Sequence, residues 1–227
     1  MSQLKSVALL LACFAVPLGF VIMSERAATS RMQGATDAAA AVPIASAADA
    51  EYCSVQLKQV VRRVASACGL LDSSGRGCKP ADAKAVAALT GDDFNALFAP
   101  LAKRAHLVQF DERDAQLDDR AKREVESVWA EKRGASFFFV VSRASTDGDA
   151  AFNEKLSEAR AQAVLAYLEA QFPGDEDLNK VGLLWLGEEF AQLGPEFCDW
   201  NRSRAGAPCT APDINRSAFV AWIDCAI

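Results

Sequence analysis

The spacing of apolar residues divides the second half of the chain into strands and helices. Short apolar runs rich in aromatic and β-branched residues predict four strands, at 107–110, 136–142, 181–189 and 217–225. Apolar positions at steps of three and four residues predict amphipathic helices at 116–134 and 151–172. The predicted order is β-α-β-α-β-β, an α+β sandwich with the helices on one face of the sheet.

Two helical patterns precede this half of the chain, at 50–71 and 81–105. The second is interrupted by Thr90-Gly91-Asp92-Asp93, which predicts a stop followed by a new helix N-terminus. Neither pattern contains a recognisable catalytic motif. We therefore predict a small helical cap over residues 51–105, packed on a domain that spans 106–227.

An uncharged apolar run, residues 7–23, follows Lys5 near the N-terminus. Its length is at the short end of what a membrane-spanning helix needs. We predict an uncleaved signal anchor, a transmembrane helix, over residues 1–23, with the remainder of the chain exported. A cleaved signal ending at Ala27–Ala28 and a lipoprotein signal acylated at Cys13 are the alternatives. Residues 24–50 are rich in Ala, Ser and Thr and predict a flexible linker.

Cysteine usage agrees with export into an oxidising compartment. Outside the apolar run there are six cysteines: Cys53, Cys68, Cys78, Cys198, Cys209 and Cys225. An even number predicts disulfides, although six cysteines allow 15 pairings. A helix over 51–67 would place Cys53 about 22 Å from Cys68, too far for a bond. The pairs Cys68–Cys78 and Cys198–Cys209 would each close a short loop, which leaves Cys53 with Cys225.

Composition and charge restrict the function further. The formal net charge is −6 and the isoelectric point is near 4.9, which argues against a nucleic-acid partner because phosphate binding needs a basic surface. One histidine, His106, leaves little room for a catalytic triad or a histidine-rich metal site. There is no CxxC pair, Gly-rich phosphate loop, HExxH or nucleophile elbow. We therefore predict no enzyme activity, no metal and no cofactor.

Four motifs in the second half carry a family resemblance. They are Phe110-Asp111, the helix residues Asn153, Leu156, Ser157, Arg160, Ala161 and Val164, then Leu186-Gly187-Glu188-Glu189, and Asn215-Arg216. In this order they resemble the OmpA-like (OmpA/MotB) peptidoglycan-binding domain. The resemblance covers about residues 106–225, and the helix motif is its most specific part. Some family members also bridge two cysteines at nearly the spacing of Cys198 and Cys209.

The resemblance implies a site for the diaminopimelate side group of peptidoglycan. In the family, the helix arginine binds a carboxylate of this group, and Arg160 holds the matching position. A guanidinium suits a carboxylate because it offers a planar fork of donors. In the competing interpretation, Arg160 only pairs with a nearby acid such as Asp147, Asp149 or Glu189. The candidate ligand-binding residues are Arg160, Asn153, Ser145, Thr146, Asp147, Leu156, Asn215 and Arg216.

The chain departs from the family where the ammonium of diaminopimelate would bind. The family has an aspartate at the position of Ser145, and a serine hydroxyl cannot neutralise an ammonium. Asp147 and Asp149 would substitute for it if the loop were re-routed. Arg143 is expected to add a positive charge at the mouth of the pocket. The family's second arginine after Asn215-Arg216 is replaced by Ser217.

Two functional hypotheses follow. In the first, the protein is a single-pass protein of the bacterial inner membrane whose periplasmic domain binds peptidoglycan noncovalently. It would anchor the membrane, or an envelope complex, to the cell wall. In the second, the domain has lost the diaminopimelate site and serves as a periplasmic protein-interaction module. Its protein partner would bind the helical cap and a surface containing Trp185, Trp200 and Trp222, unless these tryptophans belong to the core.

Overall fold

The computed structural model describes residues 53–69, 77–78, 90–96, 98–132, 137–223 and 225. They belong to one compact unit that spans Ala48–Ile227. The predicted membrane anchor and the predicted linker lie outside the described residues. Within the described ranges, no helix combines the length and the apolar character needed to cross a membrane. The domain boundary at residue 105 stays a prediction.

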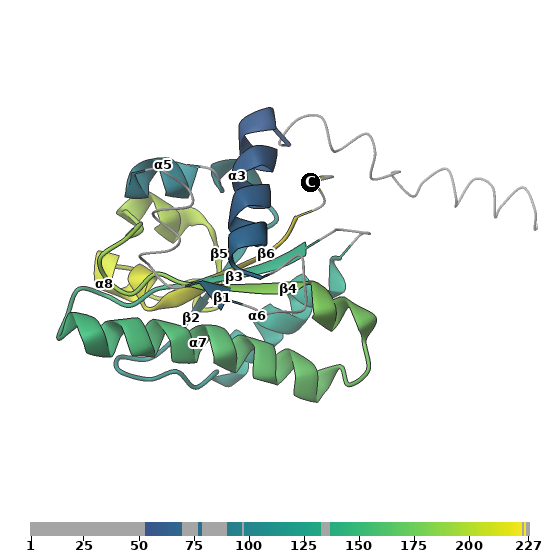
Figure 1. The fold of residues 1–227 in the computed structure, drawn as a ribbon. Coiled ribbons are helices and arrows are strands. Elements are labelled where there is room, and N and C mark those ends of the chain that lie inside the picture. Colours follow the sequence, from purple (N-terminus) through teal and green to yellow (C-terminus); the bar gives the residue numbers. More distant parts are fainter. Residues whose placement is uncertain are drawn as a thin grey trace, which may run out of the picture. The chain divides into compact units, whose positions relative to one another are not determined.

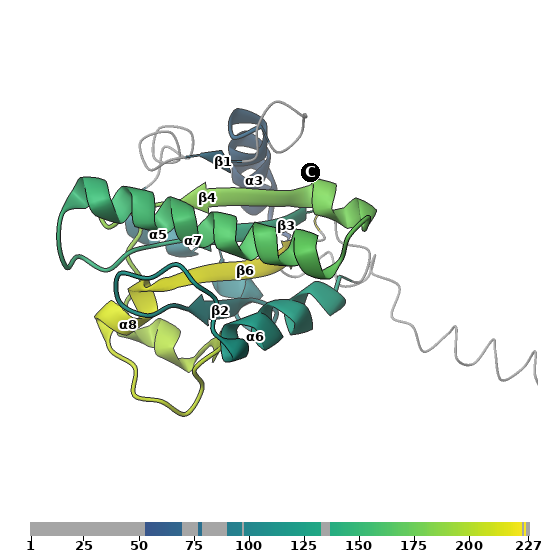
Figure 2. The ribbon, with the colours of Figure 1, turned by 90° about the horizontal axis from the view of Figure 1, so that it is seen from below.

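A six-stranded sheet forms the centre of the unit, in the order β1-β4-β3-β6-β2-β5 (Figure 1). The strands are β1 (Gly77–Cys78), β2 (His106–Gln109), β3 (Phe137–Ser142), β4 (Val181–Trp185), β5 (Asn201–Arg202) and β6 (Ser217–Ile223). All four predicted strands are present, while the two-residue edge strands β1 and β5 were not predicted. Strands β3 and β4 are parallel, and β6 lies antiparallel between β3 and β2, as Figure 2 shows. The last strand therefore occupies the middle of the sheet.

The α-helices begin at polar residues whose side chains cap free N–H groups. The α-helices are α3 (Val55–Ala67), α5 (Gly91–Ala96), α6 (Asp119–Ala130), α7 (Ala150–Gln171) and α8 (Ala211–Asn215), and the 3-10 helices are η1 (Ala99–Leu101), η2 (Glu176–Lys180) and η3 (Pro195–Asp199). Asp118 caps α6 by accepting from the Ala121 N–H at 2.7 Å, and Asp149 caps α7 by accepting from the Phe152 N–H at 3.0 Å. Thr90 caps α5, as the sequence predicted.

Both faces of the sheet are covered. Helices α6 and α7 lie against one face, where Phe138 and Val140 of β3 are fully buried. Helices α3 and α5 lie against the opposite face, which includes Phe139 and Val141 (Figure 1). The prediction of helices on one face therefore holds for α6 and α7, and the predicted helical cap buries the second face.

Three disulfides join the described cysteines, in the pairs that the sequence predicted. Cys68–Cys78 closes a loop within the cap, and Cys198–Cys209 closes a loop before α8. Cys53–Cys225 joins two cysteines that are 172 residues apart. This third bond fastens the start of the cap to the segment that follows the central strand β6.

Candidate functional site

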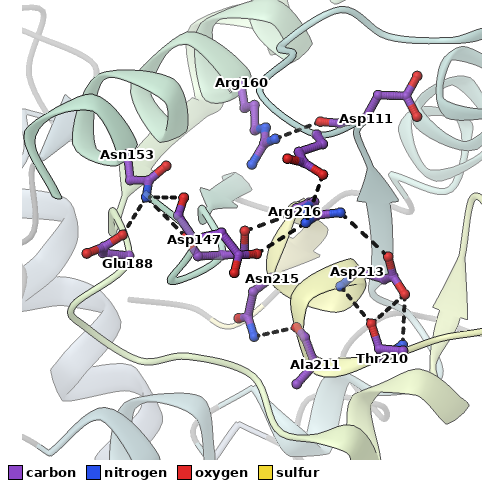
Figure 3. A network of polar contacts seen from close by, with 12 residues as sticks. Asp111, Asp147, Asn153, Arg160, Glu188, Thr210, Ala211, Asp213, Asn215 and Arg216 are labelled. Atoms are coloured by element: carbon purple, nitrogen blue, oxygen red, sulfur yellow. Dashed lines mark hydrogen bonds and ion pairs between the residues drawn. The ribbon is translucent and has the colours of Figure 1, made fainter. Parts of the chain in front are cut away.

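The candidate residues gather at one edge of the sheet because of the strand order. Strands β2 and β3 are both antiparallel to β6, so both end where β6 begins. Helix α7 starts after the loop that leaves β3, at the same edge. Figure 3 shows Arg160, Asn153, Asp147 and Arg216 converging there from α7, the loop after β3 and the start of β6.

Arg160 is completely buried and bonded to the main chain. Its Nε donates to the carbonyl of Asp114 at 2.9 Å, Nη1 to that of Arg143 at 2.9 Å, and Nη2 to that of Asp111 at 3.0 Å. Its guanidinium also lies over the ring of Phe110, 5.2 Å from the centroid. These contacts tie the loop after β2 and the end of β3 to α7. They correct the competing interpretation, because the acceptors are carbonyls rather than the carboxylates of Asp147, Asp149 or Glu189.

Burial and a neighbouring charge change the acidity of Arg160. Loss of hydration and the positive charge of Arg216 lower its pKa to about 10, while Asp114 acts in the opposite direction. The side chain stays charged at neutral pH. Figure 3 shows Arg160 and Arg216 at the same edge of the sheet.

Asn153 shapes the loop between β3 and α7. Its Nδ2 donates to the carbonyls of Ser145 and Asp147, both at 3.2 Å, and contacts the carboxylate of Glu188. Gly148 has φ +115°, a conformation that suits glycine and lets the loop turn toward α7. The asparagine of the motif therefore holds the loop in place from the first turn of the helix.

Arg216 is the partly exposed cation of this group, with 18% of its side chain accessible. Its Nε donates to Ser145 Oγ at 3.4 Å. Its Nη2 lies 3.2 Å from an oxygen of Asp147 and 3.4 Å from one of Glu112. Its Nη1 lies 3.8 Å from Asp213. The partly exposed Arg216 is therefore close to three carboxylates.

Asp213 belongs to the start of α8. It forms a capping box with Thr210, whose hydroxyl is the first cause of its lowered pKa. Burial opposes this effect, and the charge of Arg216 adds to it. Asp213 is thus engaged locally and is less available to a ligand than Asp147 or Glu112, whose side chains are 57% and 63% exposed.

The remaining predicted site residues play other parts. Asn215 is buried, and its amide exchanges hydrogen bonds with the main chain of Leu193 at 2.8 and 3.0 Å and donates to the carbonyl of Ala211 at 2.9 Å. It fastens the segment before η3 to α8. Leu156 is half-buried on α7, and Thr146 is exposed in the loop after β3.

Arg143 does not lie at the mouth of the site, which corrects the prediction. Its side chain is 2% exposed. Its Nε donates to the carbonyl of Ala191 at 2.7 Å, and its Nη2 donates to Oδ1 of Asn95, in α5, at 2.9 Å. Burial lowers its pKa to about 9. The guanidinium therefore joins the sheet to the cap, on the face opposite to α7.

Replacing Asn95 by alanine is expected to loosen the cap. The substitution removes the acceptor for the buried Arg143 and the donor to the carbonyl of Gln192, at 2.9 Å. Hydrogen bonds to charged groups contribute about 1.5–3 kcal/mol, so we expect the free energy of unfolding to fall by about 2–3 kcal/mol. Urea unfolding followed by tryptophan fluorescence measures it. The exposed Asn201→Ala serves as the control, and an equal effect of both would contradict the prediction.

The three tryptophans do not form the predicted surface. Trp222 is 3% exposed, and its Nε1 donates to the carbonyl of Trp129 at 3.2 Å. Trp185 is half-buried against the same cluster as Trp222, and Trp200 packs against the cluster on the opposite face. The alternative, that these residues belong to the core, therefore holds fully for Trp222, while Trp185 and Trp200 pack at the edges of the two clusters.

One member of the site was missed by the sequence analysis. Glu112 follows the Phe110-Asp111 motif, and its carboxylate lies beside Arg216, 104 residues further along the chain. The available signal was its place directly after a strand that ends at this edge. Within the described ranges, no group of His, Cys, Asp and Glu side chains is placed to hold a metal ion.

The solved structures that are similar to this chain include the following two. One is the OmpA-like domain of FopA1 from Francisella tularensis subsp. tularensis SCHU S4, with 21% identity and a TM-score of 0.36 over 51% of this chain and 68% of that one. The other is the peptidoglycan-associated lipoprotein from Burkholderia pseudomallei, with 21% identity and a TM-score of 0.40 over 54% of this chain and 92% of that one. No protein-family model and no curated protein matches the chain.

Proposed function

We propose that the protein binds peptidoglycan noncovalently at the edge of the sheet where α7 and β6 begin. One observation carries the proposal: a partly exposed guanidinium, Arg216, lies beside the exposed carboxylates of Asp147 and Glu112 at the place where the motifs match a peptidoglycan-binding family. A cation beside an anion complements an amino-acid end group, which carries both charges. Diaminopimelate in the stem peptide supplies such a group. The proposed role is binding without catalysis.

We further propose that this binding anchors the bacterial inner membrane, or an envelope complex, to the cell wall. Support comes from the uncharged apolar run at 7–23 and the Ala-rich segment at 24–50. The three disulfides agree with an oxidising compartment such as the periplasm. In this arrangement the N-terminal helix holds the membrane and the folded unit holds the wall.

A second function is favoured by a different observation. Arg160 is buried and donates three hydrogen bonds to main-chain carbonyls, and Ser145 carries no charge. A domain that had lost its wall ligand would have these features. It would then act as a periplasmic module that binds a protein partner.

Sedimentation with purified sacculi separates the two functions. The full chain in mild detergent is mixed with diaminopimelate-type sacculi, and we expect it to sediment with them. Free meso-diaminopimelate in excess should release it. Sacculi with lysine in place of diaminopimelate lack the second carboxylate and serve as the control. A chain that stays in the supernatant with both kinds of sacculi would contradict wall binding and support the interaction module.

A further inference from the structure

Arg160, the residue that the family motif points to, is out of reach of a ligand. It is 0% exposed, and each of its three nitrogens already donates to a carbonyl oxygen. Turning its guanidinium toward a ligand would leave the carbonyls of Asp111, Asp114 and Arg143 without this donor. Buried polar groups without partners are strongly unfavourable. Arg160 is therefore suited to hold the loops around the site.

Arg216 is the accessible guanidinium beside it. Two of its partners, Asp147 and Glu112, are more than half exposed, and exposed ion pairs of this kind contribute little to stability. A ligand can therefore replace either carboxylate on Arg216 at small cost. A carboxylate that is displaced in this way stays at the rim of the site with its own charge free to bind a cation.

Ser145 fits this arrangement better than an aspartate would. Its hydroxyl accepts from Arg216 Nε at 3.4 Å and so orients the guanidinium without neutralising it. A carboxylate at this position would compete with a ligand for Arg216. The missing negative charge is supplied two residues later, by Asp147, which is on the solvent side of the same loop.

We infer that Arg216 and Asp147 recognise the two charges of an amino-acid zwitterion by opening their own ion pair. The carboxylate of the ligand takes the guanidinium of Arg216, and its ammonium takes the freed carboxylate of Asp147, with Glu112 as the neighbouring anion. Arg160 is a positioning residue that holds the loop bearing Glu112. The inference rests on the proposed function, since the free end of diaminopimelate is a zwitterion of this kind.

Three small molecules test the inference by calorimetric titration of the full chain in detergent. meso-Diaminopimelate carries both charges, pimelate carries only the carboxylates, and cadaverine carries only the amines. We expect Arg216→Gln to lower the affinity for both diaminopimelate and pimelate about ten- to hundredfold. Asp147→Asn should weaken the binding of diaminopimelate by a similar factor. The same variant should bind pimelate as tightly as wild type or more tightly, because Asp147 no longer competes for Arg216. Arg204→Gln is the matched control, because Arg204 pairs with Asp111 and Asp118 instead and should bind as wild type does.

The variant Ser145→Asp tests whether the ammonium is bound by Asp147, as inferred here, or by a carboxylate at position 145, as in the family. If Asp147 holds the ammonium, the new carboxylate competes for Arg216, and the affinity for diaminopimelate should fall severalfold. A gain in affinity would overturn the inference.

An NMR spectrum of the arginine Nε–H groups adds a measurement that needs no variant of Arg160. Diaminopimelate should shift the signal of Arg216 and leave that of Arg160 nearly unchanged.

The outcomes distinguish the inference from the proposed function. If wild type binds neither sacculi nor diaminopimelate, both fail. If wild type binds sacculi but not free diaminopimelate, or if Arg216→Gln and Asp147→Asn bind as wild type does, the inference alone is overturned. A shift of the Arg160 signal with an unchanged Arg216 signal would overturn it as well.

Discussion

Removing the disulfide between Cys53 and Cys225 by a double alanine substitution is expected to lower the free energy of unfolding by about 3–5 kcal/mol. The bond joins residues 172 positions apart, so it restricts the unfolded chain far more than a bond across a short loop does. Both cysteines are buried in the cluster between the cap and the sheet. Their loss therefore also removes packing where α3 meets the end of β6.

The short disulfide Cys68–Cys78 provides the comparison. Its cysteines are 10 residues apart, and its removal by the same double substitution should lower the free energy of unfolding by about 2–3 kcal/mol. Urea unfolding of wild type and the two variants, followed by tryptophan fluorescence under non-reducing conditions, measures the three free energies of unfolding. A smaller effect for the long loop than for the short one would contradict the explanation by loop length.

Replacing Arg160 by alanine is expected to lower the free energy of unfolding by about 3–5 kcal/mol. The substitution leaves the carbonyls of Asp111, Asp114 and Arg143 without their donor and opens a cavity beside Phe110. Arg160→Met, which keeps most of the volume, separates the two causes. Arg160→Met should regain the part of the lost free energy of unfolding that is due to the cavity.

Arg204→Ala is the matched control for this prediction. Arg204 makes ion pairs with Asp111 and Asp118 at 2.9 and 3.1 Å, but its side chain is 24% exposed. Pairs of this kind contribute about 0–1 kcal/mol, so the control should unfold almost as wild type does. Equal unfolding midpoints for the two alanine variants would show that Arg160 does not hold the loops. A loss of wall binding in Arg160→Ala must accordingly be compared with its stability before it is assigned to a ligand contact.

The central elements could be predicted because each has a local signal. Strand β3 is a continuous run of apolar residues, and apolar residues recur at steps of three and four in helix α7. The spacing of the cysteines along a helix and around loops favoured the observed pairs among 15 possible pairings. The edge strands β1 and β5 have two residues each, too few for a pattern. Helix α8 is also short, and its local signals were the capping box formed by Thr210 and Asp213 and the proline, Pro212, in its first turn.

The candidate site was only partly predictable. Arg143 was expected at the pocket, but it continues the alternation of Phe139 and Val141, and this places its side chain on the cap side of the sheet. A strict period-two interpretation of β3 and the residue after it would have found this. The contacts of Arg216 with Glu112 and Asp147 join residues from three loops, and no local pattern in the sequence indicates that they meet.

The position of β6 has a mechanical consequence. In the proposed arrangement with an N-terminal membrane tether, tension would reach Cys53 and pass through the disulfide to Cys225, just beyond the end of β6. A ligand held by Arg216 would pull at the other end of the same strand. The load would then run through the disulfide and the covalent backbone of one central strand, so the hydrogen bonds of β6 to β2 and β3 would not have to carry it. Such a path would leave the helices of the cap unloaded.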